Sequence, residues 1–214
     1  MSDSKLREDM CFWAASLFDR GLTGGASGNI SVRTPDGGLL VTPTGVSLGR
    51  LDPAALSRFD AQGQHIDGPA PTKEMPLHSA FYETRTNAGA VVHLHSTHSV
   101  ALSMLPETDP EDAVPPLTAY AVMRVGKVAL LPFFVPGDPA MADALRGLGG
   151  RRSAVLLANH GPVVASKDLE AAVFAMEELE ETAKLALLLR GTGAQPLRGD
   201  QIAQVVDKFK LDRD

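Results

Sequence analysis

The sequence has one cysteine, no long apolar run and no cluster of basic residues, and each scarcity excludes a class of protein. With Cys11 alone, neither an intrachain disulfide nor a thiolate-rich metal site can form. The longest apolar stretches fall far short of the roughly 20 residues that a membrane-spanning helix needs. The opening segment, MSDSKLREDM, lacks the basic-then-apolar order of a secretion signal. We therefore expect a cytoplasmic protein that has no membrane partner.

The charge of the chain is mildly acidic. Lysine and arginine number 20 against 26 aspartates and glutamates, which gives a formal net charge of −6. Such a chain is a poor partner for nucleic acid, although local geometry still allows a small anion to bind. The 214 residues are 44% hydrophobic and 21% charged, an ordinary globular composition. We expect one compact α/β domain that spans residues 1–214.

Helical and extended segments follow one another along the chain. Apolar residues recur at helical spacing in the opening segment, which is predicted to end near Gly21, and again over residues 168–189. Short apolar runs bounded by turn residues predict strands over 30–33, 39–42, 88–94, 128–135, 153–158 and 162–165. Further helices are expected over 76–85, 98–105 and 139–148, and a hairpin turn over 61–64. This order predicts helices packed on a largely antiparallel sheet.

Two histidines, His93 and His95, stand at the end of a predicted buried strand. Side chains alternate along a strand, so both imidazoles would point to the same side. Neutral imidazole is the commonest protein ligand for zinc and similar metals, and three protein ligands with an open position are typical of catalytic sites. The pair alone is equally consistent with two histidines on a solvated face.

His160 lies in LLANHGPVVA, where Asn159 and Gly161 mark a tight turn between two apolar strands. The scaffold presents a polar residue in such a turn rigidly, although a histidine there can also satisfy backbone carbonyls. Together with His93 and His95, it favours a site in which three histidines hold a divalent metal. We assign no ligand role to the other histidines, which are His65, His78 and His98.

Glu74 lies in PTKEMP, immediately before a predicted helix. An acidic residue there is stabilised by the helix N-terminus by roughly a few tenths of a kcal/mol. Alternatively, it is a general acid/base beside the metal, where burial would raise its pKa into a useful range. The residues alone leave both interpretations open. Two loops of small residues, 25–29 and 44–45, can present N–H groups and hydroxyls to a phosphate, although hairpin turns explain their glycines equally well.

Five motifs, in the same order along the chain, resemble the class II aldolase/adducin family. They are SGNISVR (27–33), VTPTG (41–45), PTKEMPLH (71–78), AVVHLHS (90–96) and LLANHGPVVA (156–165). The resemblance extends from the first helix to the end of the long helix near residue 189. It implies a three-layer α/β/α fold around a central, mainly antiparallel sheet. It also implies a homotetramer with four-fold symmetry whose active sites lie at subunit interfaces.

The resemblance also implies a role for each matching residue. Glu74 would be the catalytic acid/base, and the metal ligands would be His93, His95 and His160. The substrate phosphate would be bound by Gly28, Asn29, Thr44, Gly45, Thr72 and Lys73. Zinc suits the imidazoles, while manganese, cobalt and iron stay open. Non-catalytic adducin-like members lose the histidines, so the retained triad favours an enzyme.

Three reactions compete within the family: aldol cleavage, sugar-phosphate epimerisation and decarboxylation of a 3-oxo sugar-acid phosphate. Epimerases have aspartate where Glu74 stands, and aldolases commonly have two small hydroxyl residues where this chain has Thr72-Lys73. Tyr120 is a candidate match to a catalytic tyrosine of the aldolases, but the segment after Leu197 contains no tyrosine. TKE, PPLTAY (115–120) and FFVPGDPAMAD (133–143) are most similar to decarboxylases that act on 3-oxo-tetronate 4-phosphate.

The resemblance therefore implies a carbon–carbon lyase that converts this phosphorylated sugar acid to dihydroxyacetone phosphate and CO₂ through a metal-stabilised enediolate. A fuculose-phosphate-like aldolase would pass through the same enediolate and is the nearest alternative. A non-enzymatic adducin-like interaction module is an alternative of another class.

Overall fold

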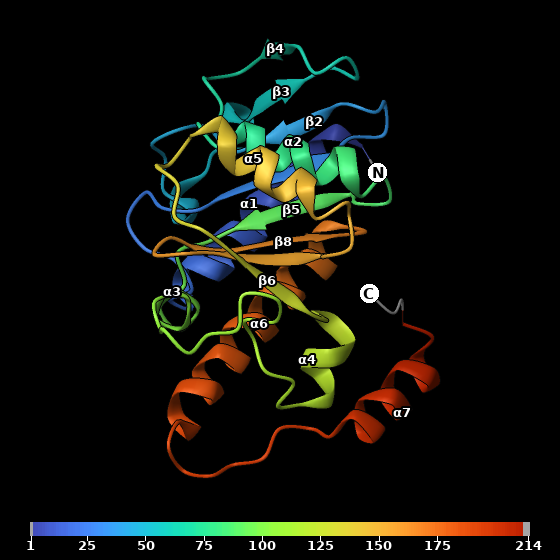
Figure 1. Ribbon diagram of the computed structural model, residues 1–214. Coiled ribbons are helices and arrows are strands. Elements are labelled where there is room, and N and C mark those ends of the chain that lie inside the picture. The colour runs from blue at the N-terminus through green and yellow to red at the C-terminus, as the bar shows by residue number, and fades with distance from the viewer. Residues whose placement is uncertain (1, 212–214) are drawn as a thin grey trace.

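The computed structural model describes residues 2–211, which build one eight-stranded sheet with helices on both faces (Figure 1). The strand order is β4-β3-β2-β1-β5-β8-β7-β6, in which β6 and β7 are parallel and the other neighbouring pairs are antiparallel. The strands are β1 (Asn29–Arg33), β2 (Leu39–Val41), β3 (Ser57–Phe59), β4 (His65–Asp67), β5 (Ala90–His93), β6 (Val128–Leu131), β7 (Ala154–Leu157) and β8 (Gly161–Ser166).

The helices form the two outer layers. They are α1 (Asp3–Asp19), α2 (Met75–Thr84), α3 (Thr97–Ser103), α4 (Ala119–Arg124), α5 (Pro139–Gly147), α6 (Leu169–Leu189) and α7 (Gly199–Phe209), with two short 3-10 turns at Leu48–Arg50 and Pro53–Ala55. In Figure 1, α2 and α5 lie in front of the sheet, while α1 and α6 lie behind it. The predicted three-layer α/β/α fold with a mainly antiparallel sheet is confirmed.

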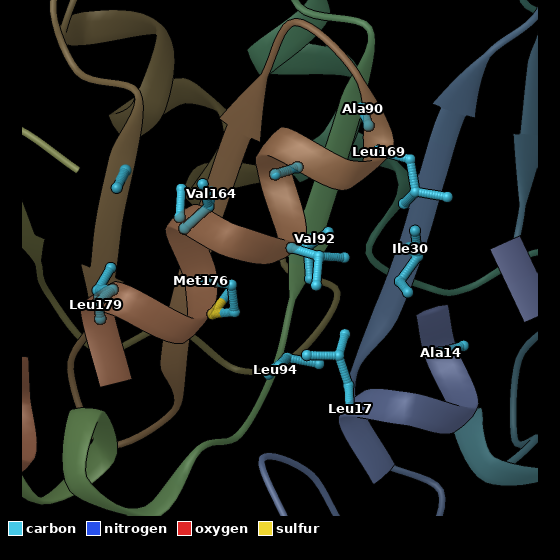
Figure 2. Packing of buried hydrophobic residues seen from close by; sticks show 14 of the residues in the cluster. Ala14, Leu17, Ile30, Ala90, Val92, Leu94, Val164, Leu169, Met176 and Leu179 are labelled. Carbon is cyan, nitrogen blue, oxygen red and sulfur yellow. The ribbon is translucent and has the colours of Figure 1, made fainter. Parts of the chain in front are cut away.

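Two apolar clusters hold these layers together, one on each face of the sheet. Leu17 of α1 and Met176 of α6 pack against Ile30 of β1 and Val92 of β5 in the first cluster (Figure 2). Phe81 of α2 belongs to the second cluster, which α5 completes. Because side chains alternate along a strand, the odd-numbered residues of β1 and β5 face α2. That alternation is what brings the polar side chains of β1 under α2.

The structure differs from the sequence-based prediction at the ends of two strands and in two helices. β5 ends at His93, so His95 follows the strand instead of belonging to it, and β6 ends at Leu131, before the predicted limit of 135. Helices α4 and α7 were not predicted. α4 is short, whereas α7 has a clear apolar repeat, formed by Ile202, Val205, Val206 and Phe209, although none of its described residues is buried. Among residues 2–211, no helix is long and apolar enough to cross a lipid bilayer.

Candidate metal and substrate site

Three histidine rings meet at one end of the sheet. His93 ends β5, His95 follows it, and His160 lies in the turn from β7 to β8. The ring centroids are 5.0 Å apart for His93 and His95, 4.9 Å for His93 and His160, and 4.7 Å for His95 and His160. One ring nitrogen from each histidine lies within 4.8 Å of the other two, and within residues 2–211 this is the one group of that kind.

The turn that carries His160 is packed tightly against the segment that carries His95. Asn159 adopts a left-handed conformation with φ 58°, and its N–H donates to the hydroxyl of Ser103, 3.1 Å away. A Cβ on Gly161 would lie 2.2 Å from the carbonyl oxygen of Leu94, which only glycine avoids. Close backbone packing therefore fixes the distance between two of the three imidazoles.

The protonation of the histidines suits metal binding. Nδ1 of His93 lies 2.9 Å from the carbonyl oxygen of Pro162, to which it donates, so Nε2 keeps its lone pair for a ligand. Burial lowers the pKa of His93 to about 3. Burial is also the main cause that lowers the pKa of His95 and the pKa of His160. All three imidazoles are therefore neutral at physiological pH, the form that binds metal.

Glu74 points at the triad instead of serving the helix that it precedes. It occupies the N-cap of α2, yet its side chain makes no capping hydrogen bond among the described residues. Oε2 accepts a hydrogen bond of 2.7 Å from the Asn29 side-chain amide and lies 3.3 Å from Nε2 of His93. Oε1 lies 3.3 Å from Nε2 of His160, is buried and has no hydrogen-bond partner within residues 2–211. Of the two interpretations of Glu74, this geometry favours the functional one.

The pKa of Glu74 differs from the sequence-based expectation. Burial acts to raise it, but the hydrogen bond that the Asn29 amide donates to Oε2 favours the ionised carboxylate, and the pKa lies below its usual value. Glu74 therefore rests in the ionised form at neutral pH. The expected upward shift was wrong because the buried amide that stabilises the carboxylate could not be recognised from the sequence.

The donor set fits a divalent cation. Nε2 of His93 and Nε2 of His160 are 3.3 Å apart. Two nitrogens bound to a tetrahedral zinc at roughly 2.0–2.1 Å are separated by about 3.3 Å, so this spacing needs little adjustment. The buried Oε1 of Glu74, which lacks a hydrogen-bond partner among the described residues, is oriented toward the same point.

A cavity of about 190 Å³ opens beside this cluster. Its wall includes His95, His160 and Glu74, together with all six residues that the resemblance assigned to phosphate binding: Gly28, Asn29, Thr44, Gly45, Thr72 and Lys73. Larger hollows of about 320 Å³ and 660 Å³ lie elsewhere, and they are lined by other residues. The chemistry-bearing side chains thus converge on the small cavity.

Tyr120 and the histidines without a predicted ligand role lie outside the cavity wall. Tyr120, on α4, is 57% exposed and has the Arg124 guanidinium 5.9 Å from its ring centroid. His65 lies on the exposed strand β4, and His98 is hydrogen-bonded to Glu180. Neither histidine belongs to the group of three formed by His93, His95 and His160.

His78 is the residue whose importance the sequence did not reveal. It is fully buried on α2, and its Nε2 lies 2.5 Å from Oδ1 of Asn29, the residue that holds Glu74. The available signal was the four-residue spacing of Glu74, His78 and Tyr82, which places all three on one side of a helix. That spacing alone is too common to single them out.

Comparison with known proteins identifies the family. The sequence profile described as "Class II Aldolase and Adducin N-terminal domain" matches residues 8–187. The chain belongs to the class II aldolase and adducin family. The resemblance carried by the five motifs is therefore confirmed.

One relative is a 3-oxo-tetronate 4-phosphate decarboxylase from Pectobacterium atrosepticum. It is 46% identical over 204 residues, which cover 95% of this chain and 94% of that protein. An L-fuculose phosphate aldolase from Escherichia coli is 32% identical over 214 residues, covering 98% and 96% of the two chains.

Solved structures of class II aldolase and adducin proteins share the fold. YgbL from Klebsiella pneumoniae, described as an aldolase, epimerase or decarboxylase, superposes with a TM-score of 0.92 at 45% identity and covers 96% of this chain and 99% of its own. An L-fuculose 1-phosphate aldolase superposes with a TM-score of 0.85 at 27% identity, covering 99% of each chain.

Proposed function

We propose that the chain is a carbon–carbon lyase that decarboxylates 3-oxo-tetronate 4-phosphate to dihydroxyacetone phosphate and CO₂. The observation that carries this proposal is the Glu74 carboxylate beside the three histidines. Its Oε1 lies 3.3 Å from Nε2 of His160, and its Oε2 lies 3.3 Å from Nε2 of His93. The relatives named for this decarboxylation are 46% identical, whereas those named for aldol cleavage are 32% identical. The difference favours decarboxylation over the aldolase alternative.

We propose that His93, His95 and His160 hold a divalent metal, with zinc as the first choice. When bound, such a metal supplies a Lewis acid for the ketone oxygen of the substrate. Glu74, which is ionised in the resting protein, takes up a proton from the solvent at Oε1 and holds it for the carbon that loses CO₂. The bond between the carboxylate and the neighbouring carbon breaks, CO₂ leaves, and the electron pair left behind forms a C–H bond with the proton from Glu74.

The substrate phosphate would occupy the part of the cavity formed by the two small-residue loops and Lys73. Thr44 donates its own N–H to the carbonyl of Ala70, so its hydroxyl is the group that remains for an anion. Lys73 is exposed at the cavity wall and would contribute its positive charge. Both polar ends of the Asn29 amide are already bonded inside the protein, which makes Asn29 a partner of Glu74 more than of phosphate.

We infer a cytoplasmic homotetramer with four-fold symmetry, in which neighbouring subunits complete each active site. Tyr120 is exposed and lies outside the cavity of its own chain, which suits a contribution to the pocket of a neighbour. Phe133 and Val135 are 60% and 64% exposed and lie within three residues of Pro136, which lines the cavity. Such a patch beside the pocket mouth is suited to burial in a subunit interface.

The product distinguishes the proposed reaction from its nearest alternative. The metal-loaded enzyme is incubated with 3-oxo-tetronate 4-phosphate and, separately, with ketose 1-phosphates, and CO₂ and aldehyde are both measured. We expect CO₂ from the first substrate and little aldehyde from the second. Aldehyde release without CO₂ would establish the aldolase instead, and a protein that binds no metal would favour the adducin-like module.

Glu74→Gln tests the proton-transfer role within the same assay. Because glutamine keeps the size of the side chain but cannot carry the proton, we expect bound metal to be retained and kcat to fall by about 10²–10⁴. A kcat near the wild-type value would remove Glu74 from the mechanism.

A further inference from the structure

We propose that His78 is a positioning residue that acts through Asn29 to hold Glu74 in its working orientation. A buried chain of hydrogen bonds runs from Tyr82 through Ser31, His78 and Asn29 to Oε2 of Glu74. It ties down one carboxylate oxygen and leaves Oε1 directed at the three imidazoles. The inference rests on the proposed role of Glu74 and adds residues that contact neither the metal ligands nor the cavity.

The chain of hydrogen bonds follows from the matching repeats of a helix and a strand. Four residues of α2 advance about 6 Å, and two residues of a strand advance about 6.6 Å. The spacing of Glu74, His78 and Tyr82 therefore matches the spacing of the β1 residues that face them. Asn29 meets Glu74 and His78, and Ser31 meets His78 and Tyr82.

The chemistry of each group gives the chain one direction. Oδ1 of Asn29 only accepts, so Nε2 of His78, 2.5 Å away, carries the hydrogen. Nδ1 of the neutral ring then accepts from the hydroxyl of Ser31, at 2.7 Å. The oxygen of Ser31 in turn accepts from the hydroxyl of Tyr82, at 3.0 Å. Every group thus donates one hydrogen bond in the direction of the carboxylate. In a buried environment, the successive hydrogen bonds of such a series strengthen one another.

The histidine decides which way the Asn29 amide is turned. Rotated by half a turn, the amide would place its oxygen against the ionised carboxylate of Glu74. The Nε2–H of His78 opposes this rotation because it needs an acceptor, and Oδ1 is that acceptor. His78 and Ser31 are both 0% exposed, so water cannot replace either partner. At the far end, the Arg33 guanidinium lies 4.7 Å from the centroid of the Tyr82 ring and covers it.

The test compares two replacements of His78 in the metal-loaded enzyme. His78→Leu fills the space but removes the donor, whereas the amide N–H of His78→Gln can reach the position of Nε2. We expect His78→Leu to lower kcat at least tenfold with KM and metal content near wild type. His78→Gln is expected to recover most of the loss. A purely structural role would lower the melting temperature of His78→Leu while leaving kcat per metal-loaded molecule within twofold of wild type, and that result would overturn the proposal.

Two further variants keep the test decisive. Ser31→Ala removes the hydroxyl that fixes the tautomer of the His78 ring, and we expect it to lower kcat by a smaller factor than His78→Leu does. If His78→Leu does not fold, Ser31→Ala takes its place in the test. An unchanged kcat in Ser31→Ala would then count against the proposal. Thr182→Val, which removes a buried hydroxyl on α6 that lacks a partner among the described residues, should leave kcat unchanged. An equal loss in Thr182→Val would show that any buried polar change has this effect.

Crystal structures of the same variants without metal give a readout that does not depend on turnover. The bond from Nδ2 of Asn29 to Oε2 of Glu74, 2.7 Å in the wild type, should be lost in His78→Leu and kept in His78→Gln. An intact bond in His78→Leu contradicts the positioning role, whatever reaction the enzyme performs. Absence of CO₂ from the wild type would overturn the proposed reaction alone and leave this structural comparison valid.

Discussion

Replacing Gly161 by alanine should disrupt the metal site while the protein still folds. The added Cβ would lie 2.2 Å from the carbonyl oxygen of Leu94 and 3.2 Å from Cα of His95. A carbon and a carbonyl oxygen normally approach to about 3.3 Å, so the two segments must separate by about 1 Å. One of these segments carries His95 and the other carries His160. Metal–ligand distances tolerate only about 0.2 Å, so the triad would no longer converge.

We expect Gly161→Ala to weaken metal binding by about 100-fold or more. The overpacking should also lower the free energy of unfolding by about 1–3 kcal/mol. Titration with a competing chelator measures the metal dissociation constant, and urea unfolding of the metal-free protein measures the stability. Gly147→Ala is the matched control, because a Cβ there meets nothing within 4 Å. Wild-type metal affinity in Gly161→Ala would refute the claim that this close approach sets the geometry of the site.

Three other changes test separate parts of the structure. Burial lowers the pKa of His78 from 6.5 to about 4, so the unfolded chain binds a proton at a higher pH than the folded protein does. The free energy of unfolding should therefore fall by on the order of 3 kcal/mol as the pH drops from about 6.5 to about 4. Urea unfolding of metal-free His78→Gln should show a smaller fall, and an identical pH dependence would contradict this. The Glu180 carboxylate accepts hydrogen bonds from the backbone N–H groups of His98 and Ser99 and from the Ser99 hydroxyl. Glu180→Ala should therefore lower the free energy of unfolding by roughly 2–3 kcal/mol in the same assay. A change near zero would show that these bonds are dispensable. Lys73→Met should raise KM about tenfold or more with kcat little changed, whereas an unaltered KM in steady-state kinetics would remove Lys73 from the phosphate site.

Local patterns predicted the sheet and its helices well, because apolar spacing reports directly on burial. The alternation in AVVHLHS correctly indicated a buried strand and two imidazoles close together, although the strand ends at His93. His95 still reaches the triad because the turn at Gly161 packs on Leu94. That contact joins segments far apart in the sequence, and no short pattern encodes it.

The residues that support Glu74 could not be predicted from the sequence, because they too are joined by contacts between segments far apart along the chain. His78 and Ser31 are ordinary residues of a helix and a strand until the register between α2 and β1 is known. Helix α4 is too short to show a helical repeat in the sequence. In α7, by contrast, the spacing of Ile202, Val205, Val206 and Phe209 was an available signal for a helix.

Metal content in a panel of histidine variants tests the central claim most directly. Elemental analysis of the purified protein, reloaded with zinc and desalted, gives the number of ions per chain. We predict one ion per wild-type chain and none in His93→Ala, His95→Ala or His160→Ala, with the fold retained. His65→Ala, which changes an exposed histidine on β4, should keep its ion. Full metal content in any variant of the triad, or its loss in His65→Ala, would contradict the account.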